Sequence, residues 1–220
     1  MMNKNELIRK TEIFVKKTLE DAEAGHDWSH IQRVVKNARK IGAGEKADPF
    51  VTELAALLHD IADSKFHGGD ELLGPEKASR FLSGLDLPDE VVRHVEAIVR
   101  HVSFSHELAP SHERDFDSIE LRVVKDADRL DALGAIGIAR AFHYGGFKNR
   151  AIYDPEITPE PDQSKEQYKK SKAPTINHFY EKLLLLKDKM NTQTGRQLAE
   201  QRHAFMEEFL DQFYREWKGE

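Results

Sequence analysis

Apolar residues recur at three- and four-residue intervals along most of this chain, which is the spacing of one face of an α-helix. No stretch keeps the strict alternation of apolar and polar residues that is typical of a half-buried strand. The pattern therefore predicts an all-α protein. The helices that it predicts are residues 31–41, 49–62, 75–83, 88–102, 119–142, 176–190 and 196–217.

Glycine and proline residues divide these helices. Gly42 and Gly44 predict the end of the helix 31–41. The segment 144–175 differs from the rest, because it combines two adjacent glycines, four prolines, many charges and weak periodicity. An insertion of this length is typically functional, and we expect it to be either a lid that closes on substrate or a static wall. The whole chain, 1–220, is expected to be a single-domain helical bundle that carries this irregular insertion.

The composition narrows the chemistry and the location. The 220 residues contain no cysteine, so any metal must be held by nitrogen and oxygen ligands. The formal net charge of −6 argues against binding to duplex nucleic acid, which usually requires a basic face. No apolar run approaches the ~18 residues of a membrane span, and the charged segment 1–12 lacks the apolar core of a signal peptide. We therefore expect a cytoplasmic protein with no membrane partner.

Two histidines and two aspartates lie next to the apolar faces of three predicted helices. They are His30 at the start of the first, the adjacent pair His59 and Asp60 in the second, and Asp128 in a later one. A buried imidazole or carboxylate is costly unless it is paired or bound to a metal. Side chains that converge from separate helices commonly build such sites in bundles. The pattern indicates a divalent-metal site, with a separate structural role for each residue as the alternative.

Four short segments carry a closer resemblance to a known family, namely residues 26–34, 57–63, 126–131 and 144–148. They are similar to segments of HD-domain phosphohydrolases, whose metal is held by a lone histidine, an adjacent His-Asp pair and a distant aspartate. The resemblance covers about His26 to Arg202 and includes a bacterial subfamily with nucleoside triphosphate pyrophosphohydrolases among its members. It implies that the metal ligands are His30, His59, Asp60 and Asp128. Asp128 is selected over Asp126 because the family's last ligand directly precedes a basic residue.

Two imidazoles and two carboxylates would fill four of about six octahedral positions and leave room for water and substrate. This ligand set suits a divalent metal, with Mn²⁺ favoured and Mg²⁺, Co²⁺, Ni²⁺, Fe²⁺ or Zn²⁺ as alternatives. A metal of this kind lowers the pKa of bound water and polarises a phosphoryl oxygen.

Four further residues are candidates for the catalytic machinery. Asp63 follows Asp60 by three residues, and it matches an acidic catalytic position of related HD nucleotidases. We expect it to orient the attacking water or to act as general acid/base, unless it only caps or pairs at a helix end. The resemblance places Arg33 and Lys65 near the metal, where their charges would bind phosphate. His101 ends an apolar helix face and is expected either to contact phosphate or to be a hydrogen-bonded core residue.

Candidate substrate-binding residues are mostly cationic or imidazole side chains, each of which could instead be a solvated surface group. They are Arg129, Asp131, His67, Lys148, Arg150, His178 and Lys182. Gly145 and Gly146 are interpreted as a turn whose amides could also approach an anion. His203 is expected at the surface, and Phe205 in the core.

These features together predict an enzyme that acts on a small-molecule nucleotide. The favoured reaction is hydrolysis of nucleoside or deoxynucleoside triphosphates to monophosphate and pyrophosphate by a metal-activated water. A 5′-nucleotidase-type phosphomonoesterase and a non-catalytic nucleotide-binding HD module are the alternatives. The chain is expected to be a monomer or a homodimer.

Overall fold

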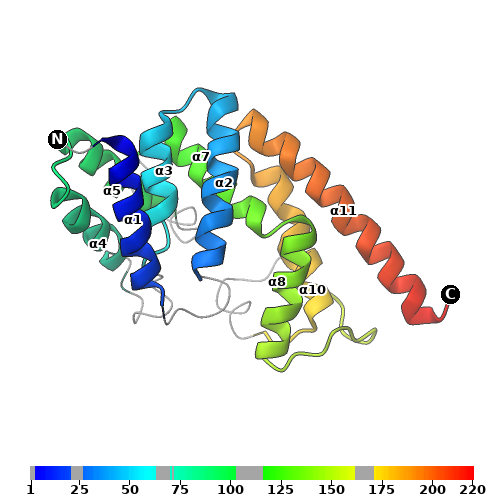
Figure 1. Cartoon of the computed structure of the whole chain (residues 1–220). Helices are drawn as coiled ribbons and strands as arrows, with labels where there is room; N and C mark the ends of the chain where they lie inside the picture. The colour runs from blue at the N-terminus through cyan, green and yellow to red at the C-terminus, as the bar shows by residue number, and fades with distance from the viewer. Residues whose placement is uncertain (1–2, 21–26, 63–69, 71, 103–115, 162–170) are drawn as a thin grey trace. The chain divides into compact units, whose positions relative to one another are not determined.

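The computed structural model describes residues 3–20, 27–62, 70, 72–102, 116–161 and 171–220 (Figure 1). All regular secondary structure in these residues is helical, which confirms the predicted all-α class. The elements are α1 (Lys4–Thr18), α2 (Trp28–Glu45), α3 (Pro49–Leu58), α4 (Leu73–Ser83), α5 (Asp89–Val102), α7 (Ile119–Asp131), α8 (Gly134–Phe147), α10 (Thr175–Glu181), the 3-10 helix η3 (Leu183–Lys189) and α11 (Gln193–Lys218).

Contacts group the chain into two compact units, Met1–Asp128 and Arg129–Glu220. The boundary falls within α7, close to its C-terminal end. The expectation of one domain over the whole chain stays a prediction, and each unit is described by itself. None of the described helices is both long and apolar enough to cross a membrane.

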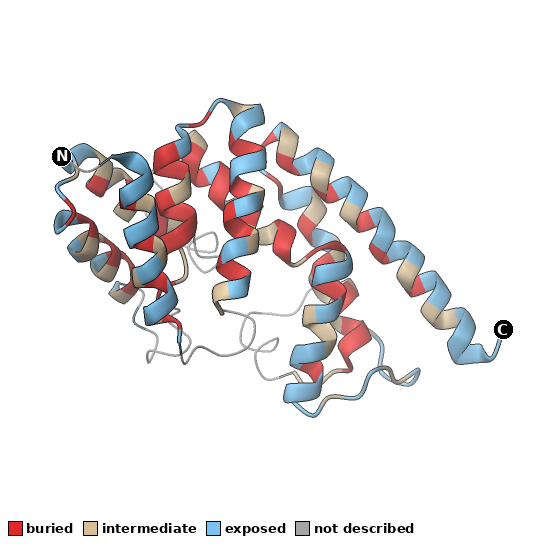
Figure 2. Cartoon of the chain, viewed as in Figure 1, coloured by how far each residue is buried: buried red, intermediate tan, exposed pale blue. Residues whose placement is uncertain are grey.

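The first unit is built around α3, whose residues are nearly all buried (Figure 2). Helices α1, α2 and α5 each pack against α3, and α4 packs against α5. The apolar face predicted for α2 supplies much of this core, with Ile31, Val34, Ala38 and Ile41 all fully buried. Because α3 is enclosed on several sides, the residues at its C-terminal end are held in a rigid, water-poor setting.

Two helix ends in the first unit differ from the predicted ones. Helix α2 continues through both glycines to Glu45 and ends where Lys46 takes a left-handed conformation, with φ of 58°. Helix α3 ends at Leu58, so His59 and Asp60 follow the helix instead of lying inside it. The imidazole of His59 bonds the carbonyl of Ala56, which in a longer helix would accept the amide of Asp60. The side chain thus takes the place of a backbone bond and favours the early end.

The predicted helix 119–142 is broken in two, because α7 ends at Asp131 and α8 begins at Gly134. Gly134 has φ of +71°, and a Cβ there would lie 3.1 Å from the Cβ of Arg202. The break therefore requires glycine at this position. It stands inside a run of good helix formers, so the periodicity carried no sign of it.

The predicted turn at Gly145 and Gly146 is wrong, since both glycines lie in α8, which extends to Phe147. A Cβ at Gly145 would overlap the hydroxyl of Thr175, so glycine here lets α8 approach the start of α10. Helix α8 thus takes up the first four residues of the predicted insertion, and α10 begins at Thr175, the last residue of that insertion.

The C-terminal part of the second unit also departs in detail from the predicted pattern. The predicted helix 176–190 divides at Lys182 into α10 and η3. Helix α11 buries the face that carries His203 and Met206, whereas Phe205 is 47% exposed. The expectations of a surface His203 and a core Phe205 are therefore both wrong. The buried stripe is shifted by one or two residues from the one that the large apolar side chains indicated.

Candidate metal centre

His30 lies in the first turn of α2, and local capping fixes that turn. The carboxylate of Asp27 accepts a hydrogen bond from the backbone amide of His30 at 2.9 Å, which is the usual N-cap interaction. The side chain of His30 is only 2% exposed. The helix therefore begins with an imidazole held in the interior.

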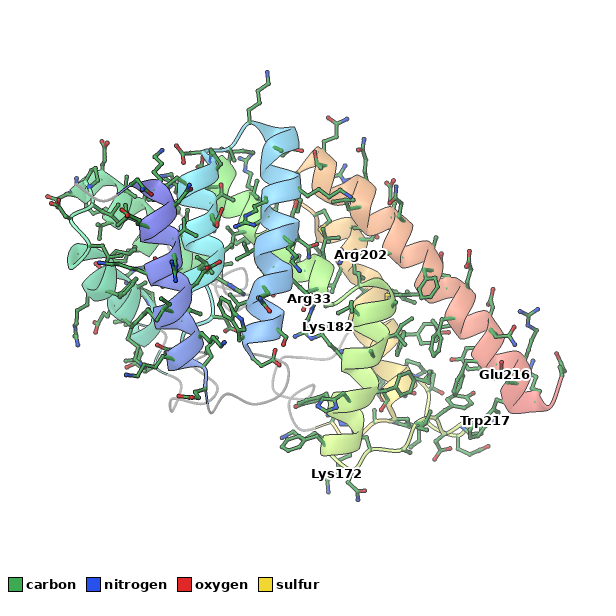
Figure 3. The ribbon with its side chains drawn as sticks, in the orientation of Figure 1. Arg33, Lys172, Lys182, Arg202, Glu216 and Trp217 are labelled. Atoms are coloured by element: carbon green, nitrogen blue, oxygen red, sulfur yellow. The ribbon has the colours of Figure 1, made fainter. Side chains whose placement is uncertain are left out.

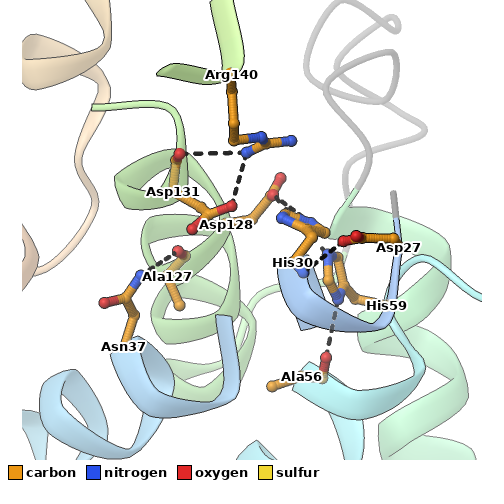
Figure 4. A network of polar contacts seen from close by, with 9 residues as sticks. All are labelled: Asp27, His30, Asn37, Ala56, His59, Ala127, Asp128, Asp131 and Arg140. Carbon is orange, nitrogen blue, oxygen red and sulfur yellow. Dashed lines mark hydrogen bonds and ion pairs between the residues drawn. The ribbon is translucent and has the colours of Figure 1, made fainter. Parts of the chain in front are cut away.

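His59 is oriented by the backbone of α3 (Figure 4). Its Nδ1 lies 2.9 Å from the carbonyl oxygen of Ala56, and because a carbonyl only accepts, Nδ1 carries the proton. In the neutral ring, Nε2 then bears a lone pair. This Nε2 is buried and accepts no hydrogen bond from any residue that the structure describes. An imidazole with one nitrogen bound to a carbonyl and the other free is the arrangement that metal ligands adopt.

Carboxylates from two other positions face the two imidazoles. Oδ1 of Asp128 lies 3.4 Å from Nε2 of His30 and 3.9 Å from Nε2 of His59 (Figure 4). One ligand atom each from His30, His59 and Asp60 lie within 4.8 Å of one another. The side chain of Asp128 is 44% exposed, so the group is open to solvent on its side.

The group fits a divalent cation by distance and by chemistry. Two atoms bound to one cation at about 2.1 Å are at most about 4.2 Å apart. Both histidine-to-Asp128 distances are below this limit, and the 4.8 Å bound among His30, His59 and Asp60 exceeds it by about 0.6 Å. Asp128 lies outside that mutually close group, so binding of one cation by all four residues requires some side-chain adjustment. The buried lone pair of His59 is costly without a partner. A cation bound among these four residues would remove that cost.

A side-chain bond that the sequence did not reveal connects two of the contributing helices. Nδ2 of Asn37 in α2 donates to the carbonyl oxygen of Ala127 in α7 at 3.2 Å. Ala127 directly precedes Asp128, so this bond sets the distance between the helix of His30 and the aspartate. Sequence reasoning also missed the roles of Asp27 and of the Ala56 carbonyl. Only the role of Asp27 could have been found from the sequence, because an aspartate just before the start of a predicted helix is a typical N-cap residue.

Two of the four predicted catalytic residues are among the residues that the structure describes. Asp63 and Lys65, together with the predicted substrate contact His67, lie outside the described residues. Arg33 is half-buried in α2, one turn from His30. His101 donates from Nδ1 to the carbonyl of Ala97 at 2.8 Å and is not in the group of mutually close ligand atoms found among the described residues.

Three predicted substrate residues gather in the second unit. Burial, together with the positive charges of Lys182 and Arg150, lowers the pKa of His178 to about 3. Lys182 and Arg150 contribute to this shift by charge repulsion, and the imidazole stays neutral at physiological pH (Lys182 is labelled in Figure 3). Arg150 also donates to the carbonyl of Ser171 at 2.8 Å, which fixes its guanidinium. Together these three residues form what we call the basic cluster.

The remaining predicted substrate residues have protein partners. Asp131 is 1% exposed, and its Oδ2 accepts from Nη1 of Arg140 at 2.8 Å. Arg129 donates to the carbonyl of Lys189 at 2.6 Å. The ammonium group of Lys148 lies 4.9 Å above the ring of Phe147. Their predicted substrate roles stay predictions, and for Asp131 the buried ion pair supports a structural role instead.

Comparisons with known proteins bear on this geometry. The family model of the HD domain matches residues 27–133 of the chain. The protein YpgQ of Bacillus subtilis is 40% identical over 209 residues, which cover 94% of this chain and 91% of YpgQ. The matched range runs from the capping residue Asp27 to Leu133 and so contains all four residues of the candidate centre.

Solved structures agree with the sequence matches. The crystal structure of an HD-superfamily hydrolase from Bacillus thuringiensis is 45% identical, with a TM-score of 0.79, and the match covers 99% of this chain and 100% of that one. The crystal structure of Bacillus subtilis YpgQ in complex with ADP is 35% identical, with a TM-score of 0.74 and coverage of 98% and 97%.

Proposed function

The chain belongs to the HD-domain hydrolase superfamily, and from that premise we propose that it hydrolyses nucleoside or deoxynucleoside triphosphates to the monophosphate and pyrophosphate. The observation that carries the proposal is the buried, unpartnered Nε2 of His59 beside the carboxylate of Asp128. A hydrolase of this type needs a cation at its centre, and this lone pair is positioned to bind one.

In the proposed enzyme, His30, His59, Asp60 and Asp128 hold a divalent metal, for which Mn²⁺ is favoured. When bound, the metal supplies an acidified water and a Lewis acid for the phosphoryl oxygen. The chain contributes the rest. The bond from Nδ1 of His59 to Ala56 keeps the ring in one tautomer, and the cap at Asp27 holds the turn that carries His30.

Proton handling and phosphate binding fall to other residues. We assign to Asp63 the orientation of the attacking water or its deprotonation. The positive charges of Arg33 and Lys65 would bind the negatively charged phosphate that reacts. The basic cluster of Arg150, His178 and Lys182 is the proposed site for further phosphate oxygens. A nucleotide ligand is supported by the YpgQ structure, which contains ADP.

The proposed reaction is tested by product analysis. The purified protein is incubated with a panel of nucleoside mono-, di- and triphosphates in Mn²⁺, Mg²⁺ or Co²⁺, and products are resolved by ion-exchange chromatography. Pyrophosphate and a monophosphate are expected from triphosphates. Orthophosphate and a nucleoside would instead identify a 5′-nucleotidase, and bound metal without turnover on any substrate would identify a non-catalytic module.

A further inference from the structure

A cavity of about 390 Å³ lies in the second unit, lined by residues of the segment 153–161, of α10 and of α11. Its lining residues include three tyrosines, one carboxamide and two prolines: Tyr153, Tyr180, Tyr214, Asn177, Pro155 and Pro159. None of the described residues that line it is charged. The volume lies within the range of small-molecule sites. We call it the tyrosine pocket.

The aromatic walls of the tyrosine pocket meet at steep angles. The ring of Tyr153 packs edge to face on Tyr214, with centroids 5.4 Å apart and planes at 73°. It stands at 84° to Trp217, whose centroid is 5.1 Å away (Trp217 is labelled in Figure 3). A flat base binds best between parallel rings, whereas rings packed edge to face leave only single exposed faces, which can still contact a compact cation. Burial and a hydrogen bond to Tyr180 raise the pKa of Tyr214, so its ring stays neutral.

A polar group in the wall lacks a partner. Asn177 is 1% exposed, and its Nδ2 donates to the carbonyl of Ile157 at 3.0 Å. Its Oδ1 is buried and accepts no hydrogen bond from any described residue. Since buried acceptors are normally satisfied, this oxygen requires an N–H or O–H donor that the described residues do not supply, either from a ligand or from a bound water.

The segment that supplies five of the lining residues is acidic in sequence. The segment 153–161 contains Asp154, Glu156 and Glu160 and no lysine or arginine. Oε1 of Glu181, at the end of α10, accepts the amide of Glu160 at 3.3 Å and holds this segment to the helix. On α11, the guanidinium of Arg215 is bound to Gln212 at 2.7 Å. A ligand that approaches this acidic segment is favoured if it carries positive charge.

From the tyrosine walls, the unpartnered Asn177 oxygen and the acidic segment 153–161, we propose that the tyrosine pocket binds an alkylammonium group. The methylene carbons lie against Tyr153 and Tyr214, and an ammonium N–H donates to Oδ1 of Asn177. The group belongs either to a small free amine or to a lysine side chain of a partner. The site uses none of the residues proposed for hydrolysis, so amine binding is tested independently of the proposed function.

Calorimetric titration of the full chain with n-butylammonium tests the proposal, with a chelator present so that metal binding plays no part. n-Butanol is the neutral probe of the same length, and tetramethylammonium is the charged probe without an N–H. We expect n-butylammonium to bind about tenfold or more tighter than n-butanol, and tighter than tetramethylammonium. Binding of Nα-acetyl-lysine methylamide would assign the site to a partner's lysine, and its failure to free amines.

Variants locate the binding on the protein. Tyr153→Leu is expected to lower the affinity for n-butylammonium about tenfold. Tyr153→Phe keeps the aromatic ring, so its affinity should stay within about twofold of the wild-type value. Glu156→Gln with Glu160→Gln changes exposed side chains only, so folding is not at risk. This double variant should lower the affinity for n-butylammonium about threefold and make that affinity less dependent on salt concentration. The affinity for n-butanol should stay unchanged.

Three results would overturn the proposal. Equal binding of n-butanol and n-butylammonium would make the pocket a plain apolar site. Unchanged amine affinity in both Tyr153→Leu and the double glutamate variant would place the amine elsewhere. Binding of a nucleoside with no binding of any amine would make it a base site.

Discussion

Histidines occupy opposite electrostatic settings in the two units of this protein. In the first unit, His30 and His59 face the carboxylate of Asp128 at 3.4 and 3.9 Å. In the second, His178 lies beside Lys182 and Arg150, and burial with these charges lowers its pKa to about 3. Carboxylates next to a ring lone pair attract a cation, whereas two cations next to a neutral ring attract an anion. The same residue type is therefore suited to opposite ligands in the two units, and its neighbours make the difference.

The largest effect expected from this comparison is at His59. Replacement His59→Gln removes the buried lone pair at the centre, so we expect kcat to fall about 1,000-fold, or roughly 4 kcal/mol of transition-state stabilisation. Bound metal, measured by plasma emission spectroscopy, should fall in parallel. His143→Gln, at an exposed position of α8, is the matched control and should keep both metal and turnover. Full turnover in His59→Gln would refute the proposed centre.

The second unit has a deeply buried carboxylate of its own, Asp131, but an arginine neutralises it. Arg140→Met leaves this carboxylate buried without its 2.8 Å partner, which should lower the free energy of unfolding by about 3 kcal/mol. Urea unfolding measures this loss, and KM for the nucleotide should stay unchanged. A raised KM with unchanged stability would instead make Asp131 the substrate contact that the sequence indicated.

The basic cluster is tested by removing one cation. Lys182→Met should raise KM for a nucleoside triphosphate about 10- to 100-fold and change kcat little, because a charge-assisted phosphate contact is lost. It should also raise the pKa of His178, followed by NMR, since Lys182 is one of the charges that lower it. Lys40→Met removes the same positive charge at an exposed position of α2, and this control should leave KM unchanged. An unchanged KM in Lys182→Met would remove the cluster from the substrate site.

The sequence was informative where local rules act alone. The apolar face of α2 and the proline start of α3 follow from spacing and capping, and both are in the structure. Helix α1 was not predicted, although Asn3 and Glu6 form a reciprocal capping box that the sequence contained. That omission was avoidable, because the two residues stand three apart at the start of the helix.

Other features depend on tertiary contacts, so no local pattern could reveal them. The break before Gly134 depends on its left-handed conformation beside Arg202. The tautomer of His59 depends on the Ala56 carbonyl. The grouping of His178 with Arg150 depends on a backbone bond between distant parts of the chain, from the amide of Thr175 to the carbonyl of Ala151. The four ligands were proposed from their placement beside apolar helix faces and from a family resemblance, and their role as ligands stays a prediction.

A smaller effect is expected in the pH dependence of stability. The pKa of His178 is about 3 in the folded protein against an ordinary 6.5, so between these values the unfolded chain binds more protons. The contribution of His178 to the free energy of unfolding is complete above about pH 6.5 and is lost as the pH falls toward 3. The free energy of unfolding should therefore fall less steeply in His178→Gln than in wild type over this range. Identical slopes would show that burial and the two neighbouring cations do not hold the imidazole neutral.

The smallest effects come from two helix caps, and they separate local stability from the proposed metal site. Asp27 caps α2 at His30, and Asn3 caps α1, which contributes nothing to the centre. Each change to alanine should cost about 1 kcal/mol in urea unfolding. Only Asp27→Ala loosens the turn that carries a proposed ligand, so it should weaken Mn²⁺ binding about tenfold in a chelator competition. Equal Mn²⁺ affinities in the two variants would mean that His30 is held by its burial alone and that the cap serves only the helix.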